Sequence, residues 1–70
     1  MELIIAFIPA KNPQTAEEII LQDPKTKESY CLRKEIAPEK LAWSNLEEGQ
    51  SITVGYIKTN GKNITKVILD

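Results

Sequence analysis

The chain has 70 residues, nine basic and ten acidic side chains, no histidine and a formal net charge of −1. A chain of this length forms one domain with a single small core, so residues 1–70 are expected to fold as one unit without a deep active-site cleft. The absence of histidine removes the usual general base near neutral pH and the commonest metal ligand, which argues against catalysis and against a metal centre.

The first predicted strand covers residues 3–8, a continuous apolar run that ends at Pro9. Unbroken apolarity indicates a strand that is buried on both faces or that lies where a barrel closes. The run lacks a basic flank and is far shorter than the roughly 20 residues of a membrane span, so neither a signal peptide nor membrane insertion is expected.

Residues 13–22 allow two interpretations. Pro13 after Asn12, and the Thr15/Glu18 spacing, resemble the start of a helix. The apolar run 19–21, however, is followed at once by the turn sequence Asp23-Pro24-Lys25-Thr26-Lys27 and by the strand-forming residues 29–32. A strand–turn–strand hairpin explains both features and is favoured.

Cys31, in the second strand of that hairpin, is the only cysteine. No disulfide can therefore form within the chain, and a small domain without disulfides is expected in a reducing compartment, here the cytoplasm. We interpret the thiol as a small, buried hydrophobe of a strand rather than as a reactive group.

The second half of the chain begins with a predicted helix over residues 38–46, because Pro38 suits a first helical position and Gly49 a stop. Trp43 is expected to cover the core from the flank of this helix. Residues 50–58 and 64–69 are predicted strands joined by Asn60-Gly61, the strongest short hairpin signal. Gly55 indicates a bulge or a bend in the first of them.

The predicted order is strand, strand, strand, helix, strand, strand. Together with the 23–27 turn, the helix from Pro38 and the Leu46–Val54 entry into the fourth strand, this order resembles the OB-fold superfamily. The resemblance implies an all-β fold class: a small, five-stranded Greek-key β-barrel with one short helix. It also implies a ligand surface on strands two and three, flanked by the loops between strands one and two and between strands four and five. Because the first strand contains no glycine, the sequence leaves closure of the barrel open.

Charge is sorted along the chain although the total is near zero. Residues 1–23 and 35–50 each carry four acids against one base, whereas residues 24–34 carry four bases against one acid and residues 51–70 three against one. Two basic hairpins, 24–34 and 58–66, are typical of a groove for a phosphate backbone, with tyrosines stacking on bases. The predicted contacts to single-stranded nucleic acid are Lys25, Lys27, Tyr30, Arg33, Lys34, Tyr56, Lys58 and Lys62. Lysines at hairpin tips also protect strand edges and keep surfaces soluble, so this second interpretation stays open.

No catalytic constellation, glycine-rich phosphate loop or metal-ligand spacing occurs in the sequence, so a non-enzymatic binding module without cofactor is expected. The alternative function is a small protein-interaction subunit or inhibitor that docks by a sheet edge or by the acidic helix. A homodimer is a variant of that alternative.

Overall fold

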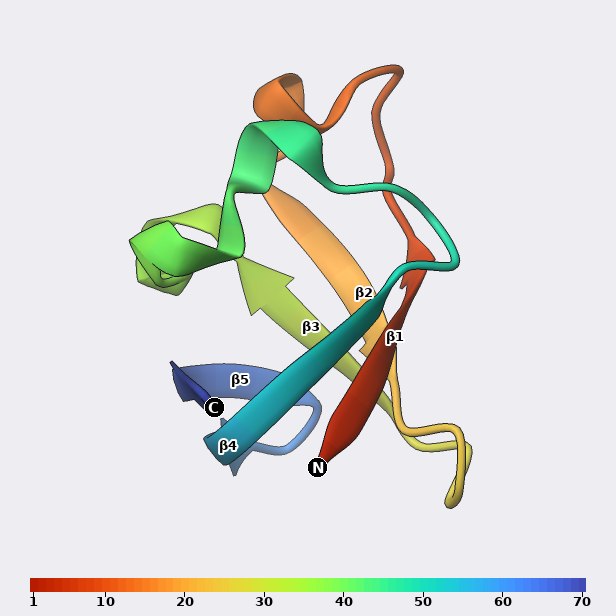
Figure 1. The fold of residues 1–70 in the computed structure, drawn as a ribbon, viewed down its shortest axis with the longest axis vertical. Coiled ribbons are helices and arrows are strands. Elements are labelled where there is room, and N and C mark those ends of the chain that lie inside the picture. Colours follow the sequence, from red (N-terminus) through yellow and green to blue (C-terminus); the bar gives the residue numbers. More distant parts are fainter.

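Five strands and four single-turn 3-10 helices make up the computed structural model, which describes residues 1–70 (Figure 1). The strands are β1 (Glu2–Phe7), β2 (Glu18–Gln22), β3 (Ser29–Arg33), β4 (Ser51–Asn60) and β5 (Asn63–Leu69). The 3-10 turns are η1 (Pro13–Thr15), η2 (Lys34–Ile36), η3 (Glu39–Leu41) and η4 (Trp43–Asn45). The predicted mostly β architecture with five strands is confirmed.

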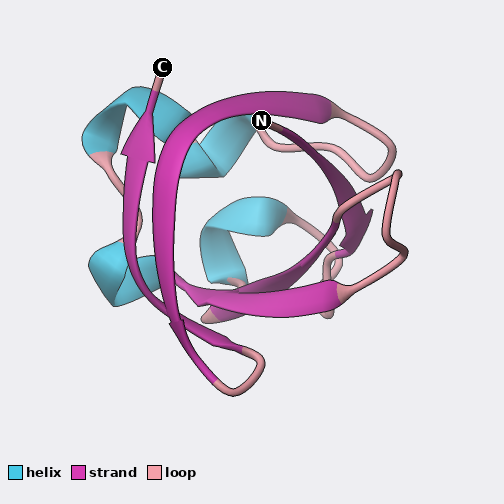
Figure 2. Ribbon diagram, turned by 90° about the horizontal axis from the view of Figure 1, so that it is seen from below, coloured by secondary structure: helices cyan, strands magenta, loops and turns pink.

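The five strands close into a ring in the order β1-β2-β3-β5-β4, which Figure 2 shows end-on. β1 pairs antiparallel with both β2 and β4, so the first strand lies where the ring closes. This position is one of the two that its continuous apolar run predicted. The seam between β3 and β5 is parallel and contains a single residue pair, Cys31 with Asn63. The ring is therefore closed, and it is thinnest at this seam.

The favoured hairpin over residues 18–33 is confirmed. β2 and β3 pair from Glu18 with Arg33 to Gln22 with Ser29. The residues that resembled a helix start form only the 3-10 turn η1, in which the Thr15 hydroxyl donates to the carbonyl of Asn12 at 2.9 Å. Strand formation prevails because Ile19 and Leu21 are both fully buried, and only a period of two directs both into the ring.

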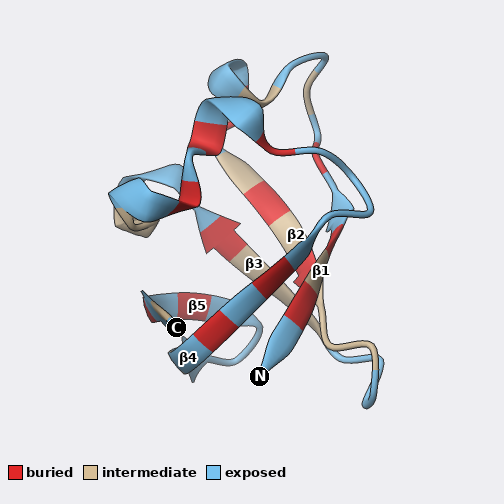
Figure 3. Cartoon of the chain, in the orientation of Figure 1, coloured by how far each residue is buried: buried red, intermediate tan, exposed pale blue.

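The core contains 14 buried residues, all of them hydrophobic. Buried positions alternate with exposed ones along the first half of β4, as Figure 3 shows. Trp43 closes one end of the ring, with 9% of its surface exposed, and its Nε1–H donates to the carbonyl of Ala16 at 3.1 Å. The predicted core role of the tryptophan is confirmed.

The segment predicted as one helix over residues 38–46 forms two 3-10 turns, η3 and η4, which are separated at Ala42. Ala42 has φ +53° and ψ +61°, a left-handed conformation that ends the first turn and begins the second. The prediction of one continuous helix was therefore wrong in this respect, although the segment is helical on both sides of the break.

Three bulges interrupt the strand registers. The extra residues are Ala6 in β1, Gly55 in β4 and Thr65 in β5. The bulge expected at Gly55 is thereby confirmed, whereas those at Ala6 and Thr65 were not predicted. Since each bulge shifts the alternation of side chains by one residue, the bulges decide which residues face outward.

Candidate nucleic-acid interface

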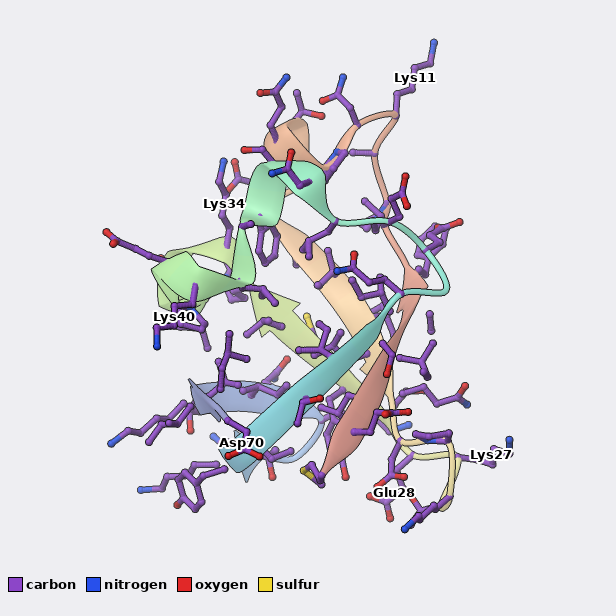
Figure 4. The ribbon with its side chains drawn as sticks, in the orientation of Figure 1. Lys11, Lys27, Glu28, Lys34, Lys40 and Asp70 are labelled. Atoms are coloured by element: carbon purple, nitrogen blue, oxygen red, sulfur yellow. The ribbon has the colours of Figure 1, made fainter.

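The β2–β3 turn carries Lys25 and Lys27 next to two carboxylates of the same turn. The Asp23 carboxylate accepts the backbone N–H of Lys25 at 2.8 Å, and the Asp23 carbonyl accepts that of Lys27 at 2.8 Å. Lys27 has a left-handed φ of +67°, and its side chain points away from the body of the molecule (Figure 4). Because Asp23 and Glu28 balance the two lysines, this turn has no net charge.

Arg33 and Lys34 lie at the other end of β3, far from Lys27 (Figure 4). Arg33 Nε forms an ion pair with Glu35 Oε1 at 3.0 Å, and Lys34 Nζ donates to the carbonyl of Gln14 at 3.0 Å. Both cations thus already have partners. The structure does not bring the four predicted cations of residues 24–34 together into one basic patch.

Tyr30 lies on the same side of β3 as the buried Leu32, and its partly buried ring packs against the core. Its hydroxyl donates to Glu28 Oε2 at 2.9 Å. This hydrogen bond to a carboxylate is the main reason why the pKa of Tyr30 is raised above its ordinary value. Tyr30 is therefore placed at the rim of the ring rather than on the outer surface of the sheet.

The β4–β5 hairpin presents a different arrangement on its outer surface. Tyr56 pairs with Ile68, and two residues further along β4 Lys58 pairs with Lys66 on the same side of the hairpin. We call these four residues the hairpin face. Tyr56 is 49% exposed and Ile68 48%, and both lysines are exposed. No acidic side chain occurs between residues 51 and 69, so the lysines here have no carboxylate on their own hairpin.

Two of the three bulges create the hairpin face. Without the bulge at Gly55, strict alternation would place Tyr56 inward with Ile52 and Val54. The bulge at Thr65 likewise places Lys66 outward, opposite Lys58, while Ile64 stays buried. Sequence reasoning included Tyr56 and Lys58 among the contacts but missed Lys66 and Ile68, because the bulge that aligns them carries no residue signal such as glycine.

The two turns that carry the predicted basic residues lie side by side. The backbone N–H of Cys31 donates to the carbonyl of Lys62 at 2.7 Å, which fastens the β4–β5 turn against β3. An open hollow of about 440 Å³ lies between the turns and is lined by Lys62, Tyr30 and Glu28, among others. The structure therefore brings Lys27, Lys62 and Tyr30 to one hollow, and the Glu28 carboxylate in the same lining offsets part of the charge of the two lysines.

Sequence reasoning also missed an apolar stripe on the outer surface of β1, β2 and β3. Phe7 pairs with Ile20, and Ile20 with Cys31, so the three side chains follow one another across the sheet. Phe7 is 53% exposed because the bulge at Ala6 turns it outward. The Cys31 thiol donates to Glu18 Oε2 at 3.1 Å, and burial followed by this hydrogen bond raises its pKa. The thiol is thus held in its unreactive, protonated form.

No group of three or more His, Cys, Asp or Glu side chains is placed to hold a metal ion. None of the helices has the length and apolar character needed to cross a membrane. No protein-family model matches the chain, and no match was found among curated proteins or solved structures. The function is therefore argued from the side chains of this chain alone.

Proposed function

We propose that the chain is a non-enzymatic module that binds single-stranded nucleic acid through the hairpin face and Lys62. One observation carries the proposal: Lys58 and Lys66 lie next to the exposed Tyr56 on the outer side of a hairpin that carries Lys62 in its turn and has no acidic side chain between residues 51 and 69. A phosphate backbone is attracted by such unpaired cations, and a base can stack on an exposed aromatic ring.

The direct pairing of Lys58 with Lys66 supports this proposal energetically. Like charges that face each other across an antiparallel pair destabilise the sheet. A phosphate bound between the two ammonium groups would remove that repulsion. Stacking of one base on Tyr56 would contribute about 1–3 kcal/mol and would not depend on sequence. We therefore infer binding with little sequence preference.

The strand order supports a Greek-key, OB-like assignment of the ring. In a Greek key, three consecutive strands neighbour one another and the fourth returns to lie beside the first. Here β1, β2 and β3 are neighbours in that order, and β4 lies on the other side of β1. The turns η2, η3 and η4 belong to the long connection from β3 back to β4. The OB-fold binds single strands in many proteins, but fold alone does not give function, so the side chains carry the proposal.

The remaining predicted contacts take a smaller part in this proposal. Lys25 and Lys27 lie beside carboxylates, and Arg33 and Lys34 have partners of their own. Arg33 and Lys34 must give up or share these interactions before they contact phosphate, and the charges of Asp23 and Glu28 offset those of Lys25 and Lys27. The four cations are expected to add weaker contacts to a longer stretch of the nucleic acid, whereas the hairpin face and Lys62 contribute most of the affinity.

The test is a fluorescence-anisotropy titration of a labelled single-stranded oligonucleotide at several salt concentrations. Three phosphate contacts predict that log K falls with log salt with a slope of about −2, or about 15-fold weaker binding between 50 and 200 mM salt. The triple variant Lys58→Gln/Lys62→Gln/Lys66→Gln should lose most of this slope. The matched control, Lys25→Gln/Lys27→Gln/Lys34→Gln, removes the same charge and should keep most of the affinity.

Two results would contradict the proposal. Wild-type protein that shows no binding at low salt would exclude it altogether. Equal weakening in the two triple variants would show that net charge alone, and not the hairpin face, determines the affinity. A circular-dichroism spectrum that is unchanged in both variants is the control for folding.

The alternative function, docking of a protein partner by a sheet edge, is favoured by one observation. β3 and β5 are joined by a single residue pair, so most of the β5 edge that faces β3 is not paired with another strand. An extended peptide could add a strand at such an edge. Retention of a protein partner from lysate after nuclease treatment would favour this function over the first.

A further inference from the structure

Two outward surfaces of this chain are complementary in chemistry. The first, which we call the apolar face, has Ile4, Phe7 and Ile20 at its centre, on the outer side of β1 and β2. Glu2 and Glu18 share that outward side, two residues away from Ile4 and Ile20 along their strands. An apolar centre with an exposed ring, that of Phe7, is thus bordered by two carboxylates, and Arg33, which pairs with Glu18, has its charge balanced by Glu35.

The second surface is the hairpin face, where Tyr56 and Ile68 form the apolar part and Lys58 and Lys66 the charged part. Phe7 on the apolar face and Tyr56 and Ile68 on the hairpin face are about half exposed, whereas Ile4 and Ile20 are partly buried. The charges that border the two surfaces have opposite signs. Such a combination favours contact between the two surfaces and disfavours contact of either surface with its own copy.

The two surfaces lie on different parts of the ring, although β1, which carries Ile4 and Phe7, pairs with the first residues of β4. In the order β1-β2-β3-β5-β4, the strands β4 and β5 are those farthest from β2 around the ring. Because both surfaces lie on the outside of a closed ring, they do not face each other within one molecule, but they can meet between two copies.

We propose that a second copy of this chain docks head to tail, with its hairpin face on the apolar face of the first. Such a contact is heterologous, so the free apolar face of one copy and the free hairpin face of the other can each accept a further copy. This proposal stands on its own and does not require nucleic-acid binding.

The size of the molecule predicts the strength of the contact. Its extents are 27 × 22 × 20 Å, and the interface can cover no more than one side of it. The buried area is then at the lower end of specific interfaces, so association is expected to be weak and to depend on protein concentration. Because the charges that border one surface are opposite in sign to those that border the other, added salt should weaken the association.

The experiment uses two variants, each altered on one surface only. Glu2→Lys/Phe7→Ser removes the ring and reverses one charge of the apolar face, whereas Lys58→Glu/Lys66→Glu reverses the charges of the hairpin face. All four positions are exposed, so the fold should persist, which circular dichroism checks. Lys40→Glu, on η3, is the matched control for a change of charge elsewhere.

Sedimentation velocity is measured for the wild type over a concentration series, for each variant alone and for their equimolar mixture. We expect the mean mass of the wild type and of Lys40→Glu to rise with concentration and each double variant to remain a monomer. The mixture should form a 1:1 dimer that grows no further, because one variant keeps its hairpin face and the other its apolar face. A wild type that stays monomeric throughout, a double variant that dimerises alone, or a mixture that stays monomeric would each overturn the proposal.

Discussion

Ala42 provides the most direct test of the structure because its left-handed backbone decides between one helix and two 3-10 turns. Its φ and ψ of +53° and +61° cost an L-residue about 1–2 kcal/mol relative to the right-handed region. Glycine adopts this conformation without that cost but loses about 0.5–1 kcal/mol more conformational entropy on folding. The substitution Ala42→Gly is therefore expected to raise the free energy of unfolding by about 0.5–1 kcal/mol.

The assay is urea denaturation followed by the fluorescence of Trp43, the only tryptophan. In a domain of this size, a gain of about 1 kcal/mol corresponds to an increase in Tm of about 4–8 °C. Ala37→Gly is the control with an ordinary backbone: Ala37 has φ −68°, so glycine brings its entropic cost of about 0.5–1 kcal/mol and also removes a methyl group that packs against the core, and this variant should be destabilised. If Ala42→Gly were destabilised as much as Ala37→Gly, residue 42 would not be left-handed, and a continuous helix over residues 38–46 would be the better description.

Three further substitutions test separate parts of the structure. Asp23→Ala removes the acceptor of two backbone N–H groups in the β2–β3 turn and should cost about 1 kcal/mol in urea denaturation, whereas an unchanged midpoint would exclude a stabilising role for these bonds. Trp43→Phe leaves the buried carbonyl of Ala16 without its donor and should cost about 1–3 kcal/mol, measured by far-ultraviolet circular dichroism; a cost near zero would mean that the indole N–H does not bind there. Glu18→Gln removes the carboxylate that helps to raise the pKa of the Cys31 thiol, so more thiolate should form at pH 8 and iodoacetamide should react faster. An unchanged rate would show that burial alone protects the thiol.

The strands and their order could be predicted from the sequence because each depends on local signals. The turn over residues 23–27 separates two runs of strand formers, and Asn60-Gly61 separates two more. These signals act within a few residues of the chain, where turn chemistry and apolar pattern agree. The ring closure could not be predicted in the same way, because it depends on pairing of β1 with β4, about 50 residues away in the sequence.

The break in the predicted helix follows from burial of three side chains at an unsuitable spacing. Leu41, Trp43 and Leu46 are all buried. On an α-helix, residues two apart point to nearly opposite sides, so Leu41 and Trp43 could not both face the core. The left-handed residue between them reorients the chain, and both side chains reach the core. The signals at Pro38 and Gly49 mark the ends of the segment but contain no information about this requirement.

The composition of the candidate interface depends on the bulges more than on the residue types. Phe7, Tyr56 and Lys66 each directly follow the extra residue of a bulge, and each is exposed. A bulge leaves backbone groups unpaired and disturbs the ladder, so it is retained where re-aiming a side chain compensates for that cost. Here the bulge in β1 exposes the ring of Phe7 and the one at Gly55 exposes that of Tyr56, although strict alternation would have buried Tyr56 beside Val54. The outward position of these two rings is thus set by the backbone itself, which is why the surfaces that carry them are the ones we propose for binding.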